Sequence, residues 1–240
     1  MESVSHGFPP GCPGQAVWVV MAKAPVPGYV KTRLCPPLRP AAAAALHTAF
    51  LTDTLAKVAV VPDARTVLFS PSQDVTEPQA EELFKRLGHP VVVQRSTGLA
   101  KGLPEATSRG FEAGYGRVVL LGSDSPMVPA AYLVEAGRLL ETHEVVVGPC
   151  DDGGYYLIGL NQPHLALFEG VPWSTSQVVG ATLAIARTQG LKTAVLPLWY
   201  DVDTPDDLKR LVADIAVRPQ EAPVTARFLA AQGWSPGGPL

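Results

Sequence analysis

The sequence predicts an α/β protein in which helices cover both faces of a parallel or mixed sheet. Apolar runs rich in β-branched residues recur along the chain, and such runs are typical of strands buried on both faces. Stretches with helical apolar spacing separate most of them, which is the rhythm of β-α units. With 240 residues, 47% of them hydrophobic and 17% charged, the chain is long enough for one domain with a sizeable core.

The predicted elements follow from this alternation in chain order. We expect strands at Ala16–Val20, Arg65–Phe69, Pro90–Gln94, Arg117–Leu121, Val145–Gly148, Tyr155–Gly159 and Thr193–Leu198. We expect helices at Pro40–Val60, Glu77–Leu87, Glu105–Ala113, Ala130–Glu141, Ser176–Gln189 and Asp206–Val217. Alanine content favours the first helix, and Gly88 closes the second. We expect a flexible N-terminus over residues 1–14, the domain over 15–217, and a partly disordered C-terminal extension over 218–240.

Composition excludes several classes of function. A net charge of -3 argues against non-specific binding to nucleic acid or to a membrane surface, since either needs a basic patch. The odd number of cysteines (Cys12, Cys35 and Cys150) without metal-ligand spacing fits a reducing compartment. The first 14 residues lack the basic start and apolar centre of a signal peptide, and no apolar run approaches the roughly 20 residues that span a bilayer. We therefore expect a cytoplasmic protein.

The loop after the first predicted strand carries three cations, Lys23, Lys31 and Arg33, in a segment that contains Pro25 and Pro27. Ligands of open α/β sheets bind outside the carboxyl ends of the strands. This loop therefore predicts an anion site, and phosphate is the anion that we expect there. The alternative is a solvated loop whose cations face water. A P-loop is excluded because Val30 stands where that motif needs glycine before the lysine.

The fourth predicted strand ends in Gly122–Pro126, which contains Asp124. A carboxylate at the end of a buried strand is placed to hold a divalent cation against a diphosphate. Without a cation, a carboxylate about 4 Å from a phosphate charge is repelled by roughly 4 kcal/mol at an effective dielectric of 20. The alternative is that Asp124 or Ser125 caps the following helix.

Two further segments combine carboxylates with turn residues. Asp151 and Asp152 lie in an Asp-Gly-Gly turn between two apolar runs, and at least one of them could orient or deprotonate a substrate hydroxyl. Thr204 is a candidate helix N-cap, which leaves Asp201 and Asp203 unexplained by capping. One of these could be a second metal ligand beside Asp124.

Other motifs are less specific. Ser174 and Gln177 have the spacing of a capping box, and the adjacent Trp173 could be either a packing residue or a platform for a sugar or base. The histidines, His47 among them, show neither the pairing of a helical metal site nor a nearby nucleophile motif, and we interpret them as incidental.

Five segments in the same order carry a resemblance to a known family. They are Ala22–Gly28 with Lys31–Leu34, Gly122–Pro126, Asp152–Gly159, Pro172–Thr175 and Asp201–Pro205. From about Val17 to Leu211 the chain resembles the DUF2064 group of glycosyltransferase-like proteins, which includes members assigned to arsenosugar biosynthesis. The resemblance implies a single-domain GT-A fold, that of nucleotide-diphospho-sugar transferases. The family is also similar to small nucleotidyltransferases such as 2-phospholactate guanylyltransferase and molybdenum cofactor guanylyltransferase.

The resemblance also implies roles for residues. Lys23, Lys31 and Arg33 would contact phosphates, and Asp124, with Asp203, would hold Mg²⁺ or Mn²⁺. The candidate nucleotide-binding residues are Ala22, Lys23, Pro25, Gly28, Lys31, Arg33, Ser123, Gly153 and Trp173. Family members usually carry a Gly-Asp-Leu-Gly element after the third strand, but Thr97–Leu103 lacks that aspartate. Glu105 is the only nearby carboxylate that could substitute for it.

These features lead to one hypothesis and two alternatives. The hypothesis is a Mg²⁺-dependent glycosyltransferase that moves a sugar from a nucleoside diphosphate to a small-molecule acceptor, with Asp151 or Asp152 acting on the acceptor hydroxyl. The first alternative is a nucleotidyltransferase that joins an NTP to a phosphorylated small molecule and releases pyrophosphate. The second is a catalytically weak nucleotide-binding relative, which the missing aspartate suggests.

Overall fold

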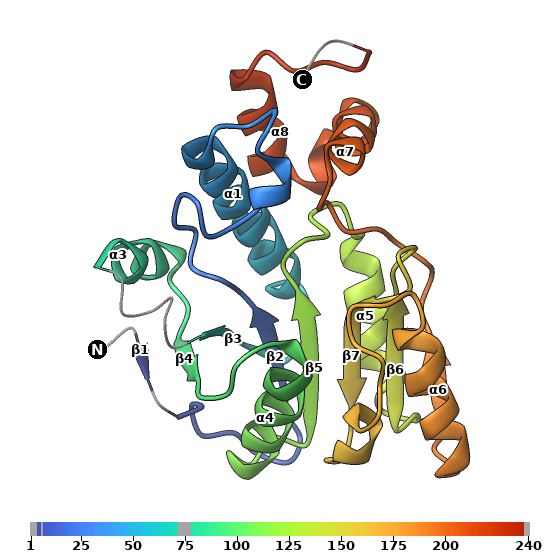
Figure 1. Ribbon diagram of the computed structural model, residues 1–240. Coiled ribbons are helices and arrows are strands. Elements are labelled where there is room, and N and C mark those ends of the chain that lie inside the picture. The colour runs from blue at the N-terminus through green and yellow to red at the C-terminus, as the bar shows by residue number, and fades with distance from the viewer. Residues whose placement is uncertain (1–3, 6, 72–77, 238–240) are drawn as a thin grey trace.

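The computed structural model describes residues 4–5, 7–71 and 78–237. Its strands form one eight-stranded sheet in the order β1-β4-β3-β2-β5-β7-β6-β8 (Figure 1). The strands are β1 (Val4–Ser5), β2 (Ala16–Met21), β3 (Ala64–Pro71), β4 (Val91–Gln94), β5 (Arg117–Gly122), β6 (Val145–Pro149), β7 (Tyr155–Leu160) and β8 (Thr193–Val195). β7 is antiparallel to both of its neighbours, and the other pairings are parallel. The predicted α/β architecture with a mostly parallel sheet is confirmed.

Helices cover both faces of this sheet (Figure 1). They are α1 (Pro40–Val58), α3 (Pro78–Leu87), α4 (Leu99–Glu112), α5 (Ala130–Leu139), α6 (Val178–Thr188), α7 (Pro205–Val217) and α8 (Pro223–Ala231), with short 3-10 turns at Thr32–Leu34, Leu165–Phe168 and Pro219–Glu221. Alternate residues of β2 point to opposite faces, as the twofold period of a strand requires. Trp18 and Val20 pack in a core that includes side chains of α1 and α5, whereas Val17 and Val19 pack in one that includes α4 and α6.

The sheet topology places the ends of β2 and β5 together. β2 lies between β3 and β5 and runs parallel to both, so the chain leaves β2 at a point where the strand order reverses. Met21 pairs with Gly122, so the two strands end at the same level. Such a switch point leaves a crevice outside the carboxyl ends of the strands.

Several element boundaries differ from those predicted. α4 begins at Leu99 rather than Glu105, because Gly98 takes a positive φ of 76° and Pro104 is accommodated inside the helix. α6 begins at Val178, and the predicted capping box does not form: Gln177 donates its backbone N–H to the hydroxyl of Thr175, not of Ser174. β8 ends at Val195, before Pro197. The start of the predicted Glu77–Leu87 helix lies outside the described residues.

The C-terminal extension contains a helix, α8, which packs against α1 (Figure 1). The carboxylate of Asp53, buried on α1, accepts hydrogen bonds from the backbone N–H groups of Val224 and Thr225 and from the Thr225 hydroxyl, at 2.7–3.0 Å. α8 is therefore capped by a residue some 170 positions earlier, so its stability depends on a long-range contact. At the other end of the chain, β1 lies within the segment predicted to be flexible and pairs with β4.

No helix in the described part of the chain combines the length and apolarity that crossing a membrane would require.

Candidate functional site

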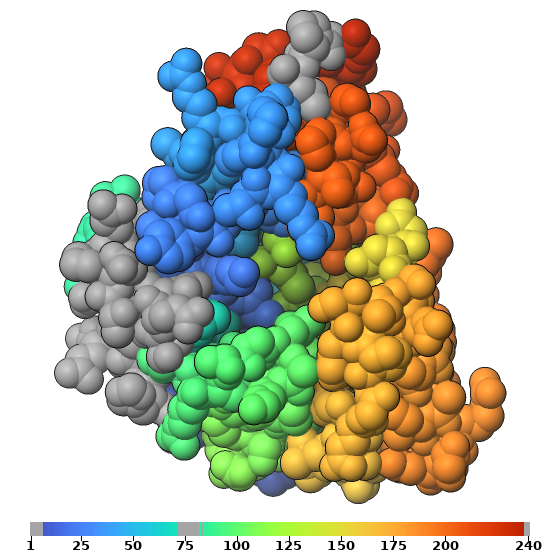
Figure 2. All heavy atoms as spheres, in the orientation of Figure 1, coloured from blue at the N-terminus to red at the C-terminus, as the bar shows by residue number. Residues whose placement is uncertain are grey.

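A cleft of about 720 Å³ opens outside the carboxyl ends of β2 and β5. Figure 2 shows it as a hollow at the centre of this face, bordered by the blue N-terminal segment, green atoms of the α4 region and orange atoms of the C-terminal half. The lining comes from the loop after β2, the start of α4, the end of β5 and the segment before α7. The cleft therefore lies where the topology predicts a ligand site.

The structure brings seven of the predicted site residues together in this cleft. They are Ala22, Lys23, Lys31, Arg33, Ser123, Asp124 and Asp203. The other six do not line it: Pro25, Gly28, Asp151, Asp152, Gly153 and Trp173. The basic loop and the two predicted metal ligands thus meet, as their positions at neighbouring strand ends indicate, whereas the Asp-Gly-Gly turn lies outside the lining.

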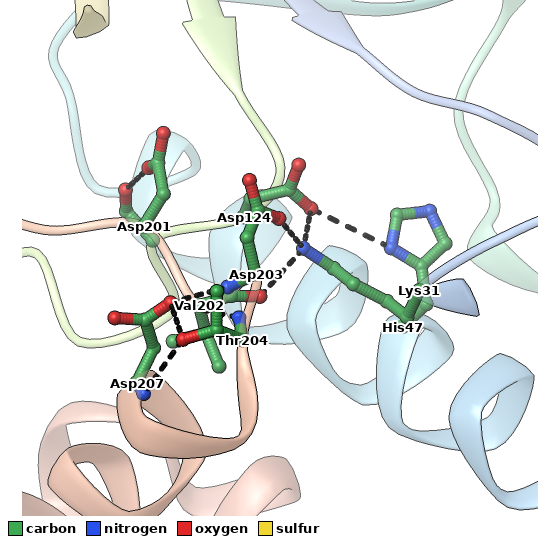
Figure 3. Close-up of polar contacts among 9 residues, drawn as sticks. Lys31, His47, Asp124, Asp201, Val202, Asp203, Thr204 and Asp207 are labelled. Carbon is green, nitrogen blue, oxygen red and sulfur yellow. Dashed lines mark hydrogen bonds and ion pairs between the residues drawn. The ribbon is translucent and has the colours of Figure 1, made fainter. Parts of the chain in front are cut away.

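The ammonium of Lys31 lies at the centre of the polar cluster (Figure 3). Its Nζ is 2.6 Å from Asp124 Oδ1 and 2.9 Å from Asp203 Oδ1, and it donates to the backbone oxygen of Val202 at 2.8 Å. All three N–H donors of an ammonium are thereby used. Burial alone would lower the pKa of Lys31, but the two carboxylates reverse this, and the pKa lies above its usual value. Lys31 therefore stays charged.

The backbone of Lys31 is unusual as well. Its φ of 49° and ψ of 36° lie in the left-handed region, which residues other than glycine rarely adopt. Strain of this kind persists only where the surrounding structure fixes it, and it is concentrated at functional sites. The conformation turns the loop so that the Lys31 side chain reaches the ends of β5 and the segment before α7.

One oxygen of Asp124, Oδ1, faces both the Lys31 ammonium and the His47 ring (Figure 3). Burial by itself raises the pKa of the Asp124 carboxyl, but nearby Lys31, His47 and Lys23 lower it below the usual range. Nδ1 of His47 is 3.8 Å from Asp124 Oδ1, and Nε2 lies 3.2 Å from the backbone oxygen of Lys23. Burial lowers the pKa of His47 to about 4, so the imidazole is neutral. The sequence did not single out His47, but the fold brings α1 against the end of β5 and places this histidine in the lining of the cleft.

Asp203 and Asp201 lie on the segment before α7. The predicted cap at Thr204 is confirmed: Thr204 and Asp207 form a reciprocal capping box, which fixes the backbone around Asp203 (Figure 3). The backbone N–H of Val202 donates to the backbone oxygen of Asp124 at 2.9 Å, which joins this segment to the end of β5. Asp201 accepts a hydrogen bond from Ser125, and burial beside Asp124 raises its pKa to about 6.

The turn predicted to carry the catalytic residues has local partners. Asp151 forms an ion pair with Arg210 at 2.6 Å, and Asp152 accepts from the backbone N–H of Gly154 at 2.8 Å. Gly153 has a φ of 90°, and a Cβ built there would lie 2.1 Å from the backbone oxygen of Ser176. These contacts account for the Asp-Asp-Gly sequence as a tightly packed turn. A catalytic role for Asp151 or Asp152 stays a prediction.

Trp173 does not line the cleft but packs against a residue that does. Its ring meets Tyr155 edge to face, with centroids 6.4 Å apart, and Tyr155 in turn lines the cleft. Trp173 therefore supports a wall of the cleft from behind.

The stretch that lacks the family aspartate borders the cleft through Thr97, Gly98 and Leu99. Glu105, the nearby carboxylate that could substitute for that aspartate, does not line the cleft. It accepts hydrogen bonds from the backbone N–H groups of Arg95 and Ser96, and its ion pair with Arg109 is 2.6 Å long. Glu105 is thus committed to fixing the β4–α4 connection.

The side chains at the centre of the cleft fit a shared cation. Asp124 and Asp203 already hold one positive charge between them, the Lys31 ammonium. Within the described ranges, however, no three His, Cys, Asp or Glu side chains form a group that could hold a metal ion. A divalent ion here would need oxygens from a substrate to complete its ligands, as Mg²⁺ commonly does at phosphate sites.

Residues 54–175, about half of the chain, match the family model described as "Uncharacterized protein conserved in bacteria (DUF2064)". No curated protein matches. A solved structure from Desulfovibrio desulfuricans G20, described as a "putative nucleotide-diphospho-sugar transferase", is 31% identical, with a TM-score of 0.82 over 91% of this chain and 95% of that one.

Two more distant structures share the fold alone. CMP:2-keto-3-deoxy-manno-octonic acid synthetase complexed with CTP is 12% identical, with a TM-score of 0.55 over 85% of this chain and 99% of that one. Rv0371c from Mycobacterium tuberculosis H37Rv, in complex with manganese, is 20% identical, with a TM-score of 0.51 over 83% and 98%. The protein therefore has a nucleotide-diphospho-sugar transferase-like fold, and the family match and the 31% identical structure show that it belongs to the DUF2064 family.

Proposed function

We propose that this protein is a divalent-metal-dependent glycosyltransferase that moves a sugar from a nucleoside diphosphate to a small-molecule acceptor. The observation that carries the proposal is the meeting of Lys31 with Asp124 and Asp203 at the switch point of the sheet. A cluster of one buried cation and two carboxylates suits a ligand that brings both negative phosphates and a divalent ion. The similarity to a protein described as a nucleotide-diphospho-sugar transferase supports the same substrate class.

The basic loop would bind the diphosphate. Lys23 and Arg33 are exposed and line the cleft, whereas the Lys31 side chain is only 4% exposed. When a diphosphate enters, the Lys31 ammonium can exchange a carboxylate for a phosphate oxygen at little electrostatic cost. Cations held close to the leaving diphosphate stabilise the negative charge that develops on it as the bond to the sugar breaks.

Asp124 and Asp203 would hold Mg²⁺ or Mn²⁺ beside the phosphates. When bound, such an ion supplies further positive charge at the leaving group. Release of Lys31 from the two carboxylates would free them for this role. The ammonium would then neutralise phosphate oxygens, so the net charge of the cluster would stay balanced throughout binding.

The acceptor hydroxyl needs a base within the cleft. The sequence predicts Asp151 or Asp152, but their partners are Arg210 and the turn backbone, outside the lining. We propose Asp201 as the better placed carboxylate, because it lines the cleft and lies beside Asp124. Its hydrogen bond from Ser125 fixes the orientation of the carboxylate.

The alternative is a nucleotidyltransferase, which would use the same cations on an NTP. The observation that favours it is the likeness of fold to a synthetase that binds CTP. In that reaction a phosphorylated acceptor attacks the α-phosphate, and pyrophosphate leaves.

The two reactions are distinguished by their products. The purified protein is incubated with Mg²⁺ or Mn²⁺ and either a panel of UDP-, GDP-, CDP- and ADP-sugars with a panel of small-molecule acceptors that carry hydroxyl groups, or the four NTPs with sugar phosphates. Release of a nucleoside diphosphate from one sugar donor, lost in Asp124→Asn, is the expected result. Pyrophosphate release from an NTP would instead support the alternative, and neither product under any condition would contradict both.

A further inference from the structure

His47 is a buried imidazole whose surroundings match those of a metal ligand. It lies on α1, only 3% exposed, and its ring faces the carboxylate of Asp124 (Figure 3). On its other nitrogen, the ring is near the backbone oxygen of Lys23. Its Nδ1 finds no hydrogen-bond partner among the residues that the structure describes. Most buried polar atoms are hydrogen-bonded, so an exception at the edge of a ligand cleft calls for a partner that binds there.

The hydrogen bond on the far side of the ring determines which nitrogen is free. Nε2 lies 3.2 Å from the Lys23 oxygen, and a carbonyl oxygen can only accept, so Nε2 carries the proton. In a neutral imidazole the other nitrogen, Nδ1, then presents a lone pair toward Asp124. A histidine that binds a metal almost always donates its second N–H to a carboxylate or backbone carbonyl in this way.

The distance between His47 Nδ1 and Asp124 Oδ1 is too long for a hydrogen bond and leaves room for an ion between the two atoms. Nδ1 and Asp124 Oδ1 are 3.8 Å apart, which is beyond hydrogen-bonding range. Bonds from a transition ion to histidine nitrogen and to carboxylate oxygen are each about 2.0–2.2 Å long. Two such bonds meeting at one ion span a separation of this size without a large movement of either side chain.

We propose that His47 Nδ1 is a ligand, together with Asp124, for the divalent ion of this cleft, and that it selects a first-row transition ion over Mg²⁺. The inference rests on the proposed function for the presence of an ion and adds the ligand and the preference. Imidazole nitrogen favours transition ions, whereas Mg²⁺ prefers oxygen ligands. Because the protein alone offers few ligands, diphosphate oxygens complete the set.

Lys31 makes occupancy conditional on the nucleotide. Its ammonium is 2.6 Å from the same oxygen of Asp124, so an ion at that oxygen meets a like charge until Lys31 moves. A diphosphate attracts Lys31 toward the phosphates. The ion therefore binds tightly only when a diphosphate is present, and the test must include one.

The experiment is pulsed electron paramagnetic resonance of Mn²⁺ bound to the full chain with ADP, GDP, CDP or UDP. A coordinated histidine gives an electron spin echo modulation from ¹⁴N, and protein labelled with ¹⁵N-histidine replaces it with the ¹⁵N pattern. This labelling needs no substitution, so folding of a variant is not at issue. It also separates histidine from nitrogens of the nucleotide base, which remain ¹⁴N.

Affinity measurements provide the second readout. We expect His47→Gln to weaken Mn²⁺ and Co²⁺ binding in the nucleotide complex at least about 10-fold, a loss in the range seen when a metal site loses a supporting group. Binding of Mg²⁺ should change less than about 3-fold. His143→Gln is the matched control, since that histidine hydrogen-bonds near the end of α5, and it should leave all three affinities unchanged.

The outcomes separate this inference from the proposed function. Mn²⁺ binding that requires Asp124 and a nucleotide but shows no histidine nitrogen coupling would overturn the role of His47 and leave the proposed function intact. A doubly protonated His47 that only donates to Asp124 would give that same result. No binding of a nucleoside diphosphate with any ion would overturn both.

Discussion

Replacement of Lys31 by methionine tests the electrostatic centre of the site. The substitution keeps most of the aliphatic stem and removes the ammonium that Asp124 and Asp203 share. Two carboxylates then face each other without the charge between them. We expect a loss of stability at pH 7 in the protein without ligand.

The magnitude follows from the burial of the three groups. Removing one partner of a fully buried ion pair costs about 3–5 kcal/mol, because an uncompensated charge remains. Here the Lys31 side chain is 4% exposed, but those of Asp124 and Asp203 are 37% and 43% exposed, so water screens part of the repulsion. We therefore expect a loss of about 2–3 kcal/mol, which lowers Tm by about 5–10 °C in a domain of this size.

The assay is urea unfolding of the wild-type and variant proteins from pH 7 to pH 3. Asp124 has a depressed pKa in the folded state, so its contribution is present above the unfolded pKa of about 3.9 and is lost as pH falls through the folded value. Without Lys31, burial raises the pKa of the Asp124 carboxyl instead, so the variant regains stability as that carboxyl protonates, and the difference between the proteins should shrink steadily as pH falls from 7 to 3. Arg33→Met, on the same loop but exposed, is the control and should cost less than about 0.5 kcal/mol.

A double-mutant cycle with Asp124→Asn isolates the pair. Residues in direct contact show coupling of about 0.5–3 kcal/mol, whereas independent sites add within about 0.5 kcal/mol. If Lys31→Met and Asp124→Asn proved additive, or if Lys31→Met were as stable as wild type at pH 7, the account of the cluster would be refuted.

Three further predictions concern other parts of the chain. Asp53→Ala should cost about 2–4 kcal/mol in urea unfolding and speed limited proteolysis near α8, since three hydrogen bonds to a carboxylate are lost; unchanged cleavage would speak against the cap. Asp201→Asn should stabilise the protein by about 1–3 kcal/mol at pH 8 and by nothing near pH 4, because a folded pKa raised to about 6 makes ionised Asp201 destabilising above that pH. A gain that does not vary with pH would contradict this assignment. Gly153→Ala should lower Tm measurably in calorimetry, since a Cβ would lie 2.1 Å from the Ser176 oxygen and the φ of 90° disfavours alanine; an unchanged Tm would show that the turn relaxes freely.

The sequence was informative about polar residues in the segments that follow predicted strands. Lys31 and Asp124 each come shortly after an apolar run, and parallel strands in register bring such positions together at one edge. The convergence of the basic loop and Asp124 at one edge of the sheet could therefore be predicted, although the left-handed backbone that brings Lys31 onto Asp124 could not. The capping box at Thr204 is likewise a local pattern, and the structure confirms it.

Long-range contacts account for what the sequence did not indicate. His47 lies inside a helix whose apolar pattern describes its packing, and nothing local shows that this face meets the end of β5. Asp53 lies in the same helix, and nothing local in the sequence shows that it caps a helix near the other end of the chain. For Asp152 the explanation is local. The backbone of its own turn donates a hydrogen bond to the carboxylate, so this residue type is accounted for without a ligand.

The most direct test of the central claim is calorimetric titration of nucleoside diphosphates, their sugar derivatives and NTPs into the protein, with and without Mn²⁺ or Mg²⁺. We predict metal-dependent binding of one nucleoside diphosphate and of its sugar derivative, weakened at least about 10-fold by Asp124→Asn and by Lys31→Met. Binding that is insensitive to both substitutions, or no binding of any nucleotide, would contradict the assignment of this cleft as the nucleotide site.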